Sequence, residues 1–260
     1  MGIALVWSAR MRAFEAVPVM FLVVACGSSP ETTSSTSPPP SPEPAAKPVA
    51  AGKLHDASKD EADGLTMRYT GKGVSLAELP MVADKIGLPV SGTADFSIDI
   101  VVPKVKGALD YSKATGRIEL ACRKCQIGDD VAKLQLTKND RAKQFAPEGM
   151  AFGHVAIDRF EAKLDIIGGK LELTSWQVDS PDLEMQSALA VTFASTLDAS
   201  ALTGCMRYKP TEALHKRDPR THDVLMLTGA QRGADGFFQI ALAGTLGTTK
   251  KLAHDCTTSL

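Results

Sequence analysis

Cys122 and Cys125 are separated by two residues, in the sequence Cys-Arg-Lys-Cys, and this spacing can support redox chemistry. A thioredoxin-like redox motif lies at the N-terminus of a helix that follows a strand. Here the pair lies between two segments with the pattern of strands, and Gly128-Asp129-Asp130 after it is typical of a turn. We therefore expect a structural role for the two cysteines rather than redox catalysis.

Cys205 and Cys256 could join the first pair in a four-cysteine zinc site, which would have the right number of ligands. They are 51 positions apart, which is not the short spacing of a metal-ligand pair. Structural disulfides are the more common use of cysteine in an exported domain, and the N-terminus described below indicates export. We therefore expect the disulfides Cys122–Cys125 and Cys205–Cys256, and no metal or other cofactor.

The histidines show no spacing that is typical of a metal or catalytic site. They are His55, His154, His215, His222 and His254. Pro219 lies between His215 and His222, so we do not expect these two to share the face of one helix. The chain also has no nucleophile elbow, phosphate-binding loop or dinucleotide-binding fingerprint. We expect a protein that is not an enzyme.

Composition narrows the class of partner and the class of fold. The chain has 260 residues, enough for one good-sized domain or two, and its formal net charge is −1. A basic nucleic-acid footprint is therefore absent, and no nucleic-acid partner is expected. Aromatic residues make up only 5% of the chain, and the many Thr, Ser, Gly, Val and Leu residues favour strands and turns.

The stretch from residue 157 to residue 193 gives the clearest structural pattern. Apolar residues alternate with charged residues from Phe160 to Ile166, which is typical of a strand with one buried face. Gly168-Gly169 then predicts a tight hairpin, and a shift of phase near Thr174 predicts a bulge in the returning strand.

A third strand is expected after a turn at residues 180–182. One face of this strand carries Leu183, Met185, Leu189, Val191 and Phe193, and the other carries Asp182, Glu184, Gln186 and Thr192. The three strands are expected to form an antiparallel meander.

Similar patterns predict strands at residues 96–102, ended by Pro103, and at 117–122, with a returning strand at 132–136. Further strands are expected at 202–208 and 238–242. Short helices are expected near residues 76–86, after the cap residue Thr211, and after Asp218-Pro219. The expected fold class is therefore mainly β (β-rich α+β), with an antiparallel sheet of meandering hairpins and a few short helices.

The N-terminus indicates the cellular address. Arg10 and Arg12 precede a short apolar run at residues 16–25, which is typical of a signal peptide rather than a membrane span. The sequence Val23-Val24-Ala25-Cys26 resembles the bacterial lipobox, which implies cleavage before Cys26 and lipidation of its thiol. The alternative is an ordinary signal peptide followed by a cysteine without this role.

The expected domains are a signal peptide at residues 1–25, a tether at 26–53 and a β-rich domain at 54–260. The tether begins with the lipidated cysteine and is rich in Pro, Ser and Thr, so it has no apolar face to bury and is expected to be disordered.

Three stretches resemble the type II secretion system protein N (GspN) family of the general secretory pathway. Residues 75–93 (SLAELPMVADKIGLPVSGT) resemble the family's SL-x-x-LP…GLP-x-SG-x segment, and residues 114–134 (ATGRIELACRKCQIGDDVAKL) resemble its GRI-x-L…I/LGD-x-x-A-x-L hairpin. Residues 208–247 resemble its final block, in which KP-x-x-AL-x-KR-x-P leads to a G-F/Y-F/Y…L-x-G-T-L-G ending. The family is similar to AsmA-like proteins, which implies a curved sheet of hairpins.

The resemblance implies a non-enzymatic accessory or scaffold component of the type II secretion system at the Gram-negative cell envelope, with other secretion subunits as partners. The alternative is an AsmA-like protein that binds or transfers lipid, with a groove lined by Leu183, Met185, Leu189 and Val191. Many family members have an N-terminal transmembrane helix, whereas this chain has a lipobox. Since Gly27 rather than Asp follows Cys26, we expect a lipid anchor in the outer membrane rather than the inner, with the domain facing the periplasm.

Overall fold

The computed structural model describes residues 52–78, 88–134, 148–226, 231–252 and 256. Cys26, the expected signal peptide and all but the last residues of the expected tether lie outside this range. So does most of the helix expected near residues 76–86, of which the structure describes a short 3-10 turn, η1 (Leu76–Glu78). None of the described helices is long and apolar enough to cross a membrane.

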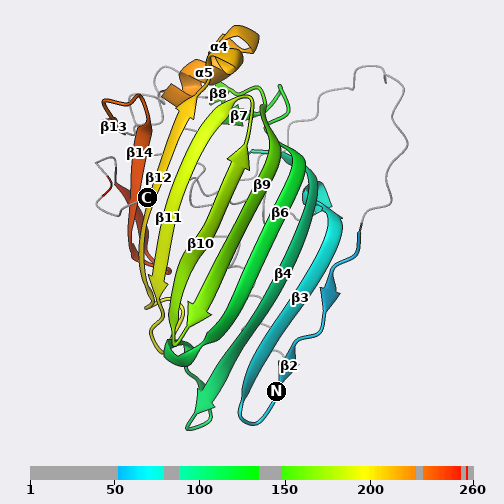
Figure 1. The fold of residues 1–260 in the computed structure, drawn as a ribbon, viewed down its shortest axis with the longest axis vertical. Helices are drawn as coiled ribbons and strands as arrows, with labels where there is room; N and C mark the ends of the chain where they lie inside the picture. The colour runs from blue at the N-terminus through cyan, green and yellow to red at the C-terminus, as the bar shows by residue number, and fades with distance from the viewer. Residues whose placement is uncertain (1–51, 79–87, 135–147, 227–230, 253–255, 257–260) are drawn as a thin grey trace.

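One large antiparallel sheet forms the body of the protein (Figure 1), and the mainly β fold class is confirmed. Its long strands lie side by side in chain order: β3 (Gly64–Ser75), β4 (Val90–Val105), β6 (Thr115–Ile127), β9 (Val155–Ile167), β10 (Lys170–Asp179), β11 (Leu183–Thr192), β12 (Ala201–Pro210) and β14 (Phe238–Thr245). Each of these long strands pairs antiparallel with the long strand before it, even where other elements lie between the two in the sequence, as between β6 and β9 and between β12 and β14.

Short strands extend this sheet at its two edges and at the end of β4. β1 (His55–Asp56) and β2 (Lys59–Asp60) pair with β3, and β5 (Ala108–Leu109) pairs with β4. At the other edge, β13 (Gln231–Arg232) and β15 (Thr249–Leu252) pair with β14. A separate two-stranded sheet consists of β7 (Lys133–Leu134) and β8 (Met150–Ala151).

The helices α4 (Glu212–Arg217) and α5 (Pro219–Met226) follow β12 and lie at one end of the sheet (Figure 1), which we call the helical end. A second 3-10 turn, η2 (Tyr111–Lys113), connects β5 to β6 at the opposite end. Thr211 accepts a hydrogen bond from the backbone N–H of Leu214 and so caps α4, as the sequence predicts.

The expected meander is present as β9, β10 and β11. Ala162 and Leu164 are buried and Lys163 between them is exposed, so the alternation indicates the buried face correctly. Gly168 and Gly169 form the hairpin, with φ of 56° and 75°. The register shifts between Leu173 and Ser175, where the change of phase predicts a bulge.

The two glycines of this hairpin differ in what surrounds them, and this difference can be tested. A Cβ on Gly168 would meet nothing within 4 Å, whereas a Cβ on Gly169 would overlap the backbone carbonyl of Ser112. Gly168→Ala is expected to lower the free energy of unfolding by about 1–2 kcal/mol because of its positive φ. Gly169→Ala is expected to cost a further amount of roughly 1–3 kcal/mol because the Ser112 backbone must move. Equal urea midpoints for the two variants would contradict this packing.

Two expectations about strands are wrong. Residues 132–134, the described part of the returning strand expected at 132–136, do not pair with residues 117–122, because β4 and β9 already occupy both edges of β6 and β7 pairs with β8 instead. The strand that was expected to end at Pro103 continues to Val105. Pro103 is tolerated because β6 pairs with β4 only as far as Val101, so this part of β4 lies beyond one of its neighbours.

The buried hydrophobic residues form two main clusters at opposite ends of the sheet. The first core lies at the end away from the helices: Leu65, Met67, Tyr69, Ile98, Ile100, Val102, Ala114, Ile118, Leu164, Ile166, Leu171, Val191 and Leu202. The second core lies at the helical end: Leu88, Val90, Leu134, Phe152, Val155, Leu183 and Val224. The apolar face expected on β11 is therefore divided, with Val191 in the first core and Leu183 in the second.

Candidate functional site at the helical end

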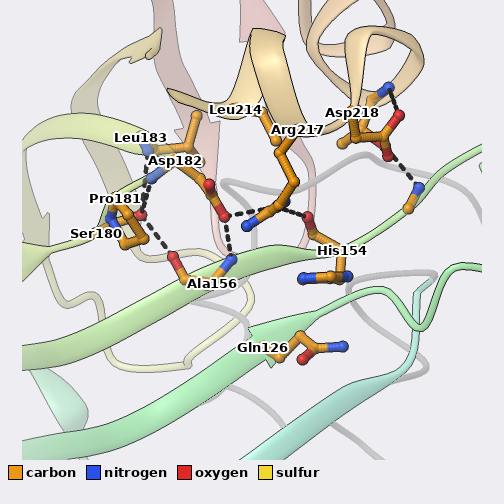
Figure 2. Close-up of polar contacts among 12 residues, drawn as sticks. Gln126, His154, Ala156, Ser180, Pro181, Asp182, Leu183, Leu214, Arg217 and Asp218 are labelled. Atoms are coloured by element: carbon orange, nitrogen blue, oxygen red, sulfur yellow. Dashed lines mark hydrogen bonds and ion pairs between the residues drawn. The ribbon is translucent and has the colours of Figure 1, made fainter. Parts of the chain in front are cut away.

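The helical end contains a network of polar contacts around Asp182, in the turn between β10 and β11 (Figure 2). The side chain of Asp182 is buried, and one carboxylate oxygen accepts a hydrogen bond from the backbone N–H of Ala156 at 2.6 Å. The same oxygen lies 2.9 Å from Nη2 of Arg217. A buried carboxylate is stable only when it is paired and hydrogen-bonded, and both conditions are met here.

Arg217 connects α4 to two strands of the sheet. Its Nη2 donates to the carbonyl oxygen of His154 at 2.6 Å as well as to Asp182. Thr211, the cap of α4, donates its hydroxyl to the carbonyl of Pro181 and its backbone N–H to the carbonyl of Asp182. The start and the end of α4 are therefore both held to the segments that flank β9 and β11.

Asp218 holds the next helix in a similar way. It accepts hydrogen bonds from the backbone N–H and the hydroxyl of Thr221, at 3.2 and 2.6 Å. The buried hydroxyl of Thr221 accepts in turn from the backbone N–H of Gly153 at 2.6 Å. Partial burial opposes ionisation of Asp218, but the hydrogen bonds from Thr221 outweigh it and lower the pKa of this carboxyl. The carboxylate therefore stabilises the fold at neutral pH, and this contribution is lost as the pH falls through the lowered pKa.

These contacts form a clamp that holds α4 and α5 to the sheet. The charge of Asp182 is neutralised by Arg217 and both groups are already hydrogen-bonded, so the pair is suited to fixing α4 in one orientation. The sequence places Asp182 in a turn and opposite the apolar face of the third strand, and the structure shows that it is buried. Its position in the turn directs it toward Arg217, which is 35 residues away, and no local pattern indicates that contact.

The structure brings both expected cysteine pairs together. The Cα atoms of Cys122 and Cys125 are 6.1 Å apart, and those of Cys205 and Cys256 are 5.5 Å apart, which are separations that a disulfide can span. Lys124 has a φ of 51°, and this local turn allows residues three apart in a strand to meet. Cys205 lies in β12, so the second pair fixes Cys256 beside the sheet.

We predict that both pairs are oxidised in the mature protein. On the loop-entropy model, the Cys205–Cys256 bond spans 51 positions and contributes on the order of 4 kcal/mol, more than the Cys122–Cys125 bond, which spans three. Peptide mapping under non-reducing conditions should recover both linked pairs, and Cys256→Ser should lower the melting temperature more than Cys125→Ser does. Free thiols at all four positions would contradict the prediction.

The histidines of the helical end also have partners that their spacing does not indicate. Nδ1 of His154 lies 2.8 Å from a carboxylate oxygen of Asp130. His215, in α4, and His222, in α5, have ring centroids 4.6 Å apart. They do not share one helical face, as Pro219 implies, but they meet across the junction between two helices.

Comparisons with models of known protein families, with curated proteins and with solved structures find no match to this chain.

Proposed function

We propose that this protein is a non-enzymatic accessory or scaffold component of a type II secretion system at the cell envelope. Its domain would face the periplasm and bind other subunits of the apparatus. A lipid on Cys26 would anchor it, in the outer membrane rather than the inner, through the Pro/Ser/Thr-rich tether.

The observation that supports this proposal is where the resembling stretches lie in the fold. Residues 75–93 supply Leu88 and Val90 to the second core, residues 114–134 supply Leu134, and residues 208–247 supply Val224. These stretches are far apart in the sequence but pack against one another at the helical end. A resemblance whose residues form one packed unit is more informative than three unconnected similarities, because residues in contact are energetically coupled.

The experiment is deletion of the gene in its host, followed by fractionation of proteins that the type II system secretes. We expect these proteins to accumulate in the periplasm, and wild-type protein supplied in trans to restore their export. Pull-downs with the lipidated protein should recover other subunits of the apparatus. Normal export in the deletion strain would contradict the proposed role.

Cys26→Ala separates the anchor from the secretion role. Wild type should partition into detergent and carry a labelled lipid precursor, because the lipid chains supply the membrane affinity. The variant should be unprocessed or soluble in the periplasm. A wild-type protein that is soluble and begins at another residue would contradict the lipid anchor. The secretion role would still be tested by the deletion experiment.

Half-buried aromatic and aliphatic residues in the middle of the sheet favour lipid binding as the second candidate function. Phe96, Leu120, Ala162 and Trp176 are successive cross-strand neighbours on β4, β6, β9 and β10. Ala162 is buried, and the other three are partly accessible. Among the described residues, the buried Nε1 of Trp176 has no hydrogen-bond partner. An acyl chain with an ester carbonyl would suit this row, because it offers apolar surface and one acceptor.

Tryptophan fluorescence tests the lipid alternative directly. The chain has two tryptophans, Trp7 and Trp176, and processing before Cys26 would remove Trp7. Brominated phospholipid should therefore quench the emission of Trp176 if lipid binds along this row, and lipid should copurify with the protein. Leu120→Asp should abolish both signals, with Ile167→Asp, at an exposed position, as the matched control. Unquenched emission and no copurified lipid would exclude this alternative.

A further inference from the structure

Three potential ligand atoms converge where α4 meets α5. Nδ1 of His215 lies 3.3 Å from Nδ1 of His222, which in turn lies 3.2 Å from Oδ1 of Asp223. All three atoms lie within 4.8 Å of one another. Imidazole nitrogen and carboxylate oxygen are ligands that a borderline divalent ion such as Zn²⁺ accepts.

These two separations fit the geometry of a tetrahedral ion. Zn–N and Zn–O bonds of about 2.0–2.2 Å place adjacent tetrahedral ligands about 3.3–3.5 Å apart. The His215–His222 and His222–Asp223 separations lie at or just below this range. The separation between His215 and Asp223 is the one that must adjust. It can do so because the side chain of Asp223 is 68% exposed and does not pack in the core.

The helices that carry these residues are fixed by other contacts. Arg217 and Thr211 hold α4 to the sheet, and Asp218 and Thr221 hold α5. The backbone positions of the three residues are therefore set before any ion binds, which reduces the entropy lost on binding. The nearby positive charge of Arg217 is paired with Asp182, and Lys216 and Arg220 are exposed, where solvent screens them.

We propose that His215, His222 and Asp223 form a binding site for a transition-metal ion of the Zn²⁺ class. The two imidazoles bind through Nδ1, the carboxylate through one oxygen, and water occupies the fourth position. Since the ligands come from both helices, a bound ion links α4 to α5 across the Asp218-Pro219 junction. The competing arrangement is a direct hydrogen bond between the two imidazoles, which needs no ion.

The experiment is titration of the oxidised, full-length mature protein with Zn²⁺ by calorimetry, after a thiol assay has shown that no free cysteine competes. We expect one ion per chain and a higher melting temperature in the presence of Zn²⁺. His215→Ala is expected to weaken binding at least about tenfold and to remove the thermal shift. His215 is exposed, so this variant should fold, and circular dichroism in the absence of metal checks that it does.

The matched control is His154→Ala, which removes the histidine that has a single carboxylate partner, Asp130, and should leave Zn²⁺ affinity unchanged. Co²⁺ provides a second readout, since tetrahedral coordination by two nitrogens should give visible absorption that His222→Gln abolishes. Wild type that binds no Zn²⁺, or His215→Ala that binds it as wild type does, would overturn the site and leave the direct hydrogen bond. Neither result bears on the secretion role.

Discussion

Leu164→Asp is expected to leave the protein largely unfolded. Leu164 is fully buried in the first core, and its cross-strand neighbours are Ile118 on β6 and Leu173 on β10. A carboxylate at this position would lose its hydration without gaining a partner, at a cost of several kcal/mol. Typical domains have a free energy of unfolding of about 5–15 kcal/mol, so this cost would remove most of the stability of the fold. Far-UV circular dichroism and a urea titration measure the effect.

Ile167→Asp provides the matched control, because it makes a similar change on the same strand. Ile167 is 77% exposed at the hairpin end of β9, so its replacement should change the free energy of unfolding by less than about 0.5 kcal/mol. If Leu164→Asp instead unfolds cooperatively near the wild-type urea midpoint, this face of the sheet is not a packed core. That outcome would favour the lipid-binding function over the scaffold.

Asp182→Ala is expected to lower the free energy of unfolding by about 3–5 kcal/mol, the range seen when one partner of a buried ion pair is removed. The variant leaves the N–H of Ala156 without its acceptor and leaves the guanidinium of Arg217 without its carboxylate. We expect the loss to be in the lower part of this range. The side chain of Arg217 is 37% exposed, so its guanidinium stays in contact with solvent and keeps its hydrogen bond to the carbonyl of His154.

The control for this variant is Asp158→Ala, which removes an exposed carboxylate from β9 near the same end of the sheet. Thermal and urea unfolding of both variants should show a large loss only for Asp182→Ala. The double variant Asp182→Ala/Arg217→Ala tests the pairing, since it should recover part of the loss by removing the unpaired cation. Additive losses in the double variant would show that the two side chains act independently.

Local features of this fold are readable from the sequence because their causes lie within a few residues. The strand from Phe160 to Ile166 alternates because successive side chains point to opposite faces, and that rule needs no knowledge of the partner strand. The Gly168-Gly169 hairpin requires positive φ, which glycine adopts without strain. Thr211 and Asp218 cap helices through their own neighbours.

Pairing over long distances was decided by the tertiary structure alone. Periodicity places residues 117–122 and 132–136 in strands, but it does not specify which strands they pair with. In the structure, β6 pairs with β4 and β9, and β7 pairs with β8. The same limit applies to the helical end. Asp182 follows a turn proline as a solvated residue would, and only the position of Arg217 accounts for its burial.

The His215–His222 pair shows most directly why local sequence determines some features and long-range contacts determine others. Pro219 ends the first helix and starts the second, so the sequence determined that these residues do not share one helical face. The angle between the two helices brings the rings together, and that angle depends on Arg217, Thr211 and Thr221 contacting segments 30 to 68 residues away. Side-chain chemistry near each residue sets its local conformation, whereas the clamp and the candidate metal site arise from contacts that form only when the whole sheet is assembled.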